Sequence, residues 1–241
     1  MRYERRGDAA WLTFDRPENA NALNPETLDE GIELLERASD ERVAVFAAGG
    51  DHFCAGGDLE AIAAIEGIEE ARGFADRLVE FLRAVETSPV PVVAAVNGDA
   101  FGAGFELVTA CDLAVAAEGA RFGVPETRMG LQPPLTVERV TDVVGRKRVA
   151  ELALTCEPIE ASKAADWGVV NRAVPPEELE GVVADTASSI AKTEPEAARL
   201  TKERINGDRG DYEEIKRRMA ERLAAPETRR RFRSAAEGHD G

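Results

Sequence analysis

The sequence predicts a mixed α/β fold in which buried strands alternate with loops and helices. Short, largely apolar runs at 43–48, 91–96 and 112–117 are typical of strands that are covered on both faces of a parallel sheet. The first two runs lead into glycine-rich turns, and helical periodicity follows each turn. After Pro125 the pattern becomes mainly helical, with one further strand predicted at 169–174.

The first elements are a hairpin and a helix with a clear start signal. Two short strands flank the turn at Gly7-Asp8. Asn24 can cap the next helix, and Pro25 suits its first position because a proline there gives up no helical hydrogen bond. The predicted apolar face of this helix consists of Leu28, Ile32 and Leu35.

The remaining elements follow the same order of strand, loop and helix. After 43–48, the loop GGDHFCAGG leads to a helix that starts near Asp58, and a second helix covers about 70–87. The turn GAGFEL (102–107) opens a short apolar helix. Mainly helical patterns then occupy 135–155, 160–167 and 176–235. We therefore predict a core domain at 1–175 and a helical subdomain at 176–241, joined at Pro175-Pro176.

Composition and charge limit the class of protein. The chain has 241 residues, of which 44% are hydrophobic and 32% charged, as expected for a globular protein. Its formal net charge of −16 argues against nucleic acid or an anionic membrane as a partner. The basic run Arg229–Arg233 is expected on a solvated helix face or at a subunit contact. Abundant carboxylates with few lysines fit a halophilic source, although a GC-rich genome also favours arginine and alanine.

Targeting signals and cysteines predict a cytoplasmic location. The N-terminus lacks the apolar segment of a signal peptide, and the chain lacks an uninterrupted apolar run of membrane-spanning length. Three cysteines, odd in number and far apart, do not form a disulfide framework.

Two glycine-rich turns are candidates for binding an oxygen atom through backbone donors. FCAGGDL (53–59) and GAGFEL (102–107) each join a strand to a helix. Glycine allows a close approach of backbone to ligand, and the first N–H groups of a helix lack helical partners. Two such turns can direct two N–H groups at one oxygen, forming an oxyanion hole. The alternative is that each turn is only a tightly packed connection.

Two glutamates are candidates for acid–base chemistry. Glu106 stands in the first turn of an apolar helix, where burial would raise its pKa toward neutrality. Glu126 follows in the proline-led turn RFGVPETRMGL. Two carboxylates that flank a substrate can divide acid and base work. Either glutamate could instead be a helix cap or an arginine partner, and spacing alone does not show that the two meet.

Other chemistries find little support in the sequence. His52 and His239 are the two histidines, so a histidine-rich metal site is excluded and no metal is predicted. Cys54, near His52, is a conceivable nucleophile, but we predict a small buried residue. A dinucleotide-binding G-x-G-x-x-G motif would need glycine at Leu107 and would bring Glu106 close to a pyrophosphate.

Several motifs together resemble the crotonase superfamily, specifically enoyl-CoA hydratases and isomerases. They are RPENANALNPETLDEG, FCAGGDLE, NGDAFGAGFELVTACDLAVA, ARFGVPETRMGL and AADWGVVNRAV, in this order along most of the chain. The resemblance implies a spiral of ββα units with two roughly perpendicular sheets. It also implies C-terminal helices that mediate homotrimers, which can pair as dimers of trimers.

The resemblance assigns roles to individual residues. Gly57 and Ala103 match the two oxyanion-hole N–H donors, and Glu106 and Glu126 match the two catalytic glutamates of hydratases. Segments expected to contact coenzyme A, mostly through backbone, include Asn19, Ala20, Ala22, Ala55, Asp58 and Leu59. The implied substrate is a 2-enoyl-CoA thioester, to whose double bond water is added; coenzyme A is part of the substrate and no further cofactor is implied. Glu106 would activate the water and Glu126 would protonate Cα.

The sequence departs from the family at two places. QPPLTVERV follows MGL where many hydratases have a proline and a glycine-rich run, so Gln132, Pro133 and Pro134 should reshape the acyl pocket. The C-terminus RRRFRSAAEGHDG lacks the usual family ending, which bears on trimer packing. The alternatives are an enoyl-CoA isomerase or another crotonase-family reaction, a non-catalytic acyl-CoA-binding subunit, and a nicotinamide-dependent oxidoreductase.

Overall fold

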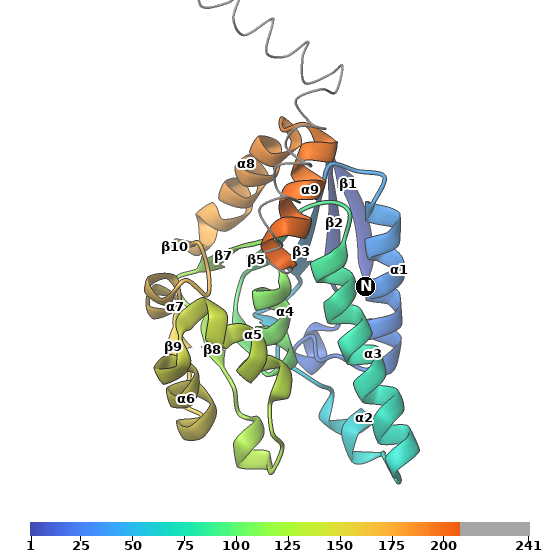
Figure 1. Ribbon diagram of the computed structural model, residues 1–241, viewed down its shortest axis with the longest axis vertical. Helices are drawn as coiled ribbons and strands as arrows, with labels where there is room; N and C mark the ends of the chain where they lie inside the picture. The colour runs from blue at the N-terminus through green and yellow to red at the C-terminus, as the bar shows by residue number, and fades with distance from the viewer. Residues whose placement is uncertain (208–241) are drawn as a thin grey trace, which may run out of the picture. The chain divides into compact units, whose positions relative to one another are not determined.

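A computed structural model describes residues 1–207, apart from the side chains of residues 134, 135 and 138. The chain divides into two compact units, Met1–Glu203 and Arg204–Gly241. The fold is α/β, as predicted, with two sheets and surrounding helices (Figure 1). The basic run at 229–233 lies outside the described residues. Within the described part of the chain, no helix has the length and apolar character required to cross a membrane.

The larger sheet has six strands in the order β1-β2-β3-β5-β7-β10. Their bounds are β1 Arg2–Arg6, β2 Ala9–Phe14, β3 Val43–Ala48, β5 Val92–Val96, β7 Leu113–Ala117 and β10 Arg172–Val174. The pair β1–β2 is the predicted antiparallel hairpin, and all other pairs are parallel. The three apolar runs therefore form neighbouring central strands.

The predicted strand at 169–174 is shorter in the structure. Residues 172–174 form β10, whereas the N–H groups of Val169 and Val170 both donate to the Ala164 carbonyl. These two residues complete the end of the preceding helix, which closes on Gly168 in the left-handed conformation. The helix end thus takes the hydrogen bonds that a longer strand would need.

The smaller sheet lies in segments for which the sequence analysis predicted no strand, and its first strand falls in the predicted loop GGDHFCAGG, which is a correction. Its order is β4-β6-β8-β9, with bounds β4 His52–Cys54, β6 Asp99–Phe101, β8 Arg121–Gly123 and β9 Ile159–Glu160. Strands of two or three residues are too short to display periodicity, which is why the pattern missed them. Consecutive strands alternate between the sheets: β3 then β4, β5 then β6, β7 then β8.

Within residues 1–207 the predicted helices are present, and the start signals at Asn24 and Asp58 are confirmed, whereas the part of the helical prediction at 208–235 lies outside the described residues. The helices are α1 Pro25–Ala38, α2 Leu59–Ala63, α3 Ile68–Thr87, α4 Ala103–Ala110, α5 Pro134–Val144, α6 Arg146–Thr155, α7 Ala161–Trp167, α8 Leu179–Ala191 and α9 Pro195–Asn206. Short 3-10 turns occur at η1 Pro17–Asn19, η2 Glu126–Met129 and η3 Pro176–Glu178. Asn24 caps α1 by accepting hydrogen bonds from the N–H (2.8 Å) and hydroxyl (2.7 Å) of Thr27.

Alternating side chains of the large sheet enter two separate apolar clusters. On one face, Leu12, Phe46 and Ala94 pack with helices α1, α3 and α4, and α1 lies beside α3 (Figure 1). On the other face, Trp11 and Val45 pack against α8 through its apolar side. Because both faces are covered, the strands read as continuous apolar runs.

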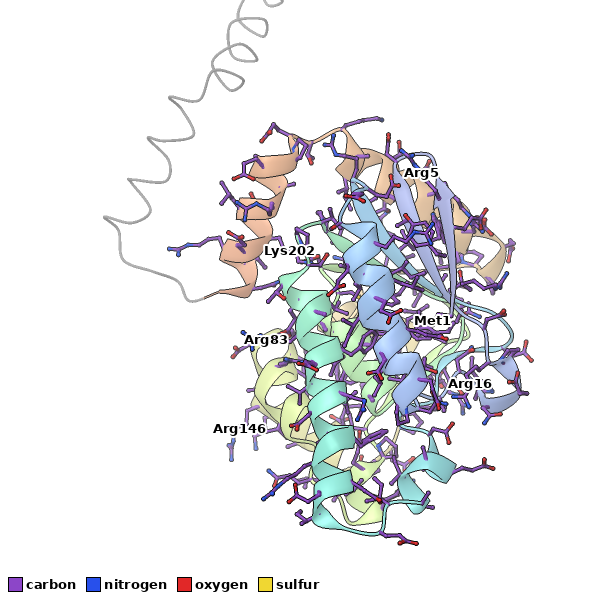
Figure 2. The ribbon with its side chains drawn as sticks, turned by 90° about the vertical axis from the view of Figure 1, so that its right-hand side faces the viewer. Met1, Arg5, Arg16, Arg83, Arg146 and Lys202 are labelled. Atoms are coloured by element: carbon purple, nitrogen blue, oxygen red, sulfur yellow. The ribbon has the colours of Figure 1, made fainter. Side chains whose placement is uncertain are left out.

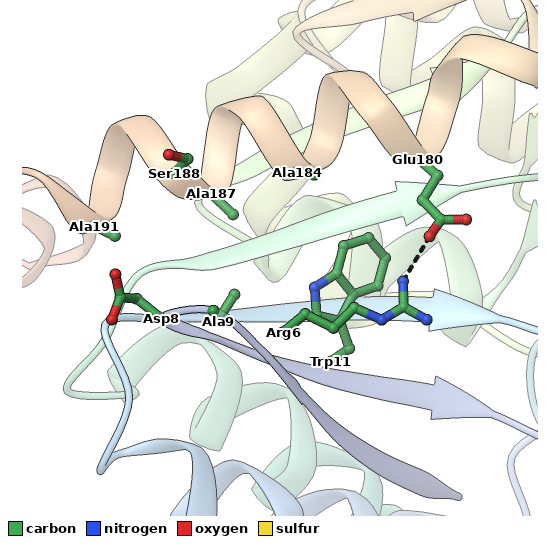
Figure 3. Close-up of a pocket in the computed structure, with 10 residues that line it drawn as sticks. Arg6, Asp8, Ala9, Trp11, Glu180, Ala184, Ala187, Ser188 and Ala191 are labelled. Atoms are coloured by element: carbon green, nitrogen blue, oxygen red, sulfur yellow. Dashed lines mark hydrogen bonds and ion pairs between the residues drawn. The ribbon is translucent and has the colours of Figure 1, made fainter.

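Helix α8 also closes the outer edge of a shallow pocket beside the hairpin. Figure 3 shows Arg6 over the ring of Trp11, 4.4 Å from its centroid, and in an ion pair with Glu180. The pocket has a volume of about 220 Å³, and none of the predicted site residues lines it. The domain boundary at 175/176 stays a prediction, although α8, beyond that boundary, packs on the sheet of the core.

Candidate active site

The two glycine-rich turns pack directly against each other. Gly56 has φ +102°, and a Cβ added there would lie 2.8 Å from the carbonyl oxygen of Phe101 and 3.5 Å from the nitrogen of Ala103. A Cβ at Gly104 would lie 2.2 Å from the carbonyl oxygen of Cys54. Glycine at these positions therefore lets strand β4 and the start of helix α4 approach backbone to backbone.

The N–H groups of Gly57 and Ala103 are both available at this junction. The N–H of Asp58 donates to Leu23 O (2.9 Å) and Leu23 N–H donates to Gly56 O (2.8 Å), so this parallel bridge leaves the N–H of Gly57 facing the other way. Ala103 begins α4, ahead of the first helical hydrogen bond. Among the described residues, neither N–H has an acceptor.

Glu106 lies in the first turn of α4 with only 5% of its surface exposed. Its Oε1 accepts hydrogen bonds from the N–H and the hydroxyl of Thr136, both at 2.8 Å. Burial raises the pKa of Glu106 above its ordinary value, and the Thr136 hydrogen bonds and the Arg139 charge oppose this shift without cancelling it. The carboxyl is thus held in a fixed orientation in an apolar surrounding.

Glu126, the first residue of η2, reaches the same turn from the other side. A Cβ on Gly102, which caps α4, would lie 2.8 Å from Glu126 Oε1. The Oε2 atom is buried and has no hydrogen-bond partner among the described residues. Burial is the main cause that raises the pKa of Glu126; a hydrogen bond from its own backbone N–H opposes this rise, and the charge of Glu106 adds to it. The structure therefore brings the two predicted glutamates together at the N-terminus of α4.

The segments expected to contact coenzyme A also meet. Besides the bridge at Leu23, the N–H of Ala55 donates to the carbonyl of Ala20 at 3.0 Å. Asn19 ends η1, and Ala20 follows in the left-handed conformation (φ 49°). Ala22 is 9% exposed, whereas Leu59, at the start of α2, is 61% exposed.

The side chain of Asp58 is occupied by structural contacts. Its Oδ1 accepts the N–H groups of Glu60 and Ala61 as the cap of α2, and Oδ2 pairs with Arg16 at 3.0 Å. Burial acts to raise the pKa of Asp58, but the hydrogen bonds from Ala61, Arg16 and Glu60 hold it below its ordinary value. Its backbone N–H also donates to Leu23 O, so Asp58 offers no free donor to a ligand, and its contact with coenzyme A stays a prediction.

The sequence analysis missed three side chains that hold the site together. Arg16 donates to Ala22 O (2.9 Å) and pairs with Asp58, which ties the first loop to the second turn. Asn21 is 1% exposed, and its amide bonds the backbone of Arg16, Gly49 and His52. Thr136 donates to Glu106 across thirty residues of sequence. The position of Asn21 between small residues is a weak sequence signal for the positive φ that it adopts. For the contact of Thr136 with Glu106, no local sequence pattern gives a signal.

Cys54 is not placed as a nucleophile. Its side chain is fully buried, and burial raises its pKa to about 12. The sequence prediction of a small buried residue is confirmed. His52 is partly exposed, with Nδ1 3.8 Å from Asp99. Within the described residues, no group of three His, Cys, Asp or Glu side chains is arranged to hold a metal ion.

We expect iodoacetamide to leave Cys54 unmodified in the folded protein, because a buried thiol with a raised pKa supplies almost no accessible thiolate. Peptide mapping by mass spectrometry after alkylation at pH 8 measures this directly. The same treatment in denaturant is the control and should modify Cys54 completely. Modification of native Cys54 at the rate of a free thiol would show that it is accessible after all.

Comparisons with known proteins identify the family of this chain. The sequence model of the enoyl-CoA hydratase/isomerase family matches residues 4–234. The short-chain-enoyl-CoA hydratase of Clostridium acetobutylicum is 35% identical over 208 residues, which cover 84% of this chain and 79% of that protein. The crotonyl-CoA hydratase of Syntrophomonas wolfei is also 35% identical, covering 84% and 80%. The crystal structure of an enoyl-CoA hydratase from Mycobacterium smegmatis has a TM-score of 0.92 at 31% identity, covering 98% and 95%. This chain therefore belongs to the enoyl-CoA hydratase/isomerase family, as its motifs indicated.

Proposed function

We propose that this protein is an enoyl-CoA hydratase, a lyase that adds water across the C2–C3 double bond of a 2-enoyl-CoA thioester. The observation that carries the proposal is the meeting of the buried Glu106 with the partly buried Glu126, whose Oε2 atom is buried, at a helix start with free N–H groups. Relatives named as enoyl-CoA and crotonyl-CoA hydratases support the same reaction.

The N–H groups of Gly57 and Ala103 form the oxyanion hole of this proposal. They donate to the thioester carbonyl, whose oxygen gains negative charge as the enolate develops. One such donor lowers the barrier by about 3 kcal/mol. The contact between the two turns through Gly56 supports a shared target oxygen.

The two glutamates divide the proton transfers. Glu106 takes a proton from water as its oxygen forms the bond to C3, and Glu126 delivers a proton to C2. The two sites differ in a way that favours this division: Glu106 accepts two hydrogen bonds from Thr136, which stabilise a carboxylate, whereas Glu126 Oε2 lacks a donor among the described residues. Because the groups are coupled, the pair and not one residue sets the apparent pKa values.

Coenzyme A is held mostly by backbone groups in this proposal. Asn19, Ala20 and Ala22 on one segment face Ala55 to Leu59 on the other, joined by the hydrogen bonds described above. The backbone N–H groups of Asn19, Ala20, Ala22, Ala55 and Asp58 already donate within the chain. Among the described residues of these two segments that we assign to coenzyme A, the N–H of Leu59, at the start of α2, is left to donate to an anionic thioester. The reaction needs no further cofactor and no metal.

Finer features follow from the family and the composition. We propose a ββα spiral, supported by strands that alternate between two sheets. We also propose a homotrimer or a dimer of trimers, a cytoplasmic location and a halophilic source. Exposed Met129 (58%), Leu131 (53%) and Leu154 (74%) are apolar surface of the kind that assembly covers. Light scattering in molar KCl and in low salt tests both assembly and salt preference.

Crotonyl-CoA is the substrate that tests the activity. Purified protein should lower the absorbance of the conjugated thioester to its equilibrium value and yield 3-hydroxybutyryl-CoA by mass spectrometry. A product with unchanged mass and a moved double bond, formed from a 3-enoyl-CoA, would indicate an isomerase. Thermal stabilisation by acyl-CoA without turnover would indicate a binding subunit, and stabilisation by a nicotinamide alone an oxidoreductase. Each of these outcomes without hydration would contradict the proposal.

A further inference from the structure

Helix α5 presents two residues to the catalytic region, and only one of them touches a carboxyl there. Thr136 donates twice to Glu106, as described above. Arg139 follows three residues later, so the two side chains are neighbours on one helix face. Figure 1 shows α5 beside α4, the helix that carries Glu106. A guanidinium is therefore fixed close to the proposed general base.

Arg139 is held in this place rather than free in solvent. Its side chain is 24% exposed, and Nε forms a 2.9 Å ion pair with Glu86 Oε1 near the end of α3. Its Nη1 is buried and has no hydrogen-bond partner among the described residues. The guanidinium thus has one side tied to Glu86, and its remaining charge acts on the interior.

The charged residues around Arg139 do not fully neutralise it, so its positive charge still acts on Glu106. Glu86 faces Lys202 as well as Arg139, and the positive charges of both oppose the rise in its pKa that burial causes. Lys202, 4% exposed on α9 (Figure 2), pairs with Asp112 at 2.8 Å and donates to the carbonyls of Val85 and Val90. Because Glu86 interacts with both Arg139 and Lys202, its single negative charge does not fully neutralise the charge of Arg139.

The charged neighbours of Glu106 come from two elements. Arg139 on α5 favours the carboxylate form of Glu106, and Glu126 on η2 disfavours two simultaneous carboxylates. Among the charged groups described, Glu126 is acted on by Glu106 and has no cation of its own. An arginine on one side of the pair makes the two glutamates unequal.

Building on the proposed hydratase function, we propose that Arg139 is a positioning residue that keeps Glu106 as the ionised member of the pair and leaves the proton on Glu126. It acts through Glu106 and touches no substrate atom. Without this charge the pair would share its proton more evenly, and a smaller fraction of the enzyme would have base and acid in their working forms.

The test compares Arg139→Gln, Arg139→Lys and Arg146→Gln. Arg146, exposed on α6 (Figure 2), loses the same charge away from the site and serves as the matched control. In Arg139→Gln we expect the acid limb of the pH profile of kcat/KM for crotonyl-CoA to move to higher pH by about one unit. At a pH below this limb, kcat/KM should therefore fall about tenfold relative to wild type. KM should change little, Arg139→Lys should restore most of the shift, and Arg146→Gln should match wild type.

A second substitution tests whether the acid limb moves in the opposite direction when the effect of Arg139 is strengthened. Glu86→Gln removes the carboxylate that competes for Arg139, so its acid limb should move to lower pH. This variant also keeps the proposal testable if Arg139→Gln does not fold. A Glu86→Gln profile identical to that of wild type, or an Arg139→Gln profile that overlays wild type, would overturn the proposal.

Carboxyl ¹³C NMR titration separates this inference from the proposed function. The Glu106 resonance, assigned by its loss in Glu106→Gln, should titrate at higher pH in Arg139→Gln without any substrate present. If wild type does not hydrate crotonyl-CoA, the proposed function fails while this titration still decides the role of Arg139. If hydration occurs and the Glu106 titration does not move, the Arg139 proposal fails alone.

Discussion

Replacement of Glu126 by glutamine is expected to lower kcat for hydration about 10²–10⁴-fold while raising the melting temperature near neutral pH. The rate falls because glutamine cannot deliver the proton to C2. Stability rises because the partly buried carboxyl lies beside the charge of Glu106, and its buried Oε2 has no donor among the described residues. Stopped-flow or steady-state absorbance with crotonyl-CoA and thermal unfolding measure the two effects.

The pH dependence of this stabilisation has a definite sign. The folded protein holds the Glu126 proton more tightly than the unfolded chain, because the pKa is raised on folding. The folded state is therefore favoured below the ordinary glutamate pKa of about 4.3, and this advantage is lost as pH rises through the folded pKa. The stabilising effect of Glu126→Gln should thus be present at pH 7 and absent at low pH.

Two further variants complete this experiment. Glu106→Gln should also lose hydration by orders of magnitude, because the water loses its base. Glu118→Gln makes the same chemical change at an exposed position and should alter neither rate nor stability. Retention of kcat within about threefold in either catalytic variant would contradict the two-carboxylate mechanism.

Replacement of Gly104 by alanine is expected to destabilise the fold by about 3 kcal/mol, at the upper end of typical overpacking costs. The added Cβ would lie 2.2 Å from the carbonyl oxygen and 2.8 Å from the Cβ of Cys54. Backbone cannot rotate away as a flexible side chain can, so α4 must move off β4. That movement carries the Ala103 N–H and the Glu106 carboxyl with it, and we expect about a 10²-fold loss of kcat.

Gly181→Ala is the matched control for this substitution. Gly181 lies in α8, where an added Cβ meets no atom within 4 Å. Alanine there should be neutral or slightly stabilising, because it restricts the unfolded chain. Chemical denaturation measures both variants. Equal stability of Gly104→Ala and wild type would mean that the β4–α4 contact is looser than the structure has it.

The local half of the site could be predicted from its residues. GAGFEL combines small residues with a helix start, and FCAGGDL has the same character, so both turns were identified as backbone donors before their contact was known. Asn24, Pro25 and Asp58 marked helix starts that the structure confirms. These signals are readable because each depends on neighbours within about four positions.

The strands of the smaller sheet could not be predicted from local sequence patterns. Strands β4, β6 and β8 have three residues each, and polar His52 and Asp99 stand within them. Their pairing depends on partners that are roughly twenty to fifty positions away, such as Cys54 with Ala100. Short segments of this kind become strands only because their neighbours supply the hydrogen bonds.

By itself the sequence determined the buried strands, the helix caps, the two glycine turns and the presence of two candidate glutamates. Only the tertiary structure decided that Glu126 reaches Gly102, that Thr136 holds Glu106 and that Arg139 stands beside this pair. The reason is physical. Caps and turns depend on short-range hydrogen bonds and backbone conformation, whereas the meeting of η2, α4 and α5 depends on the close packing of segments that are distant along the chain.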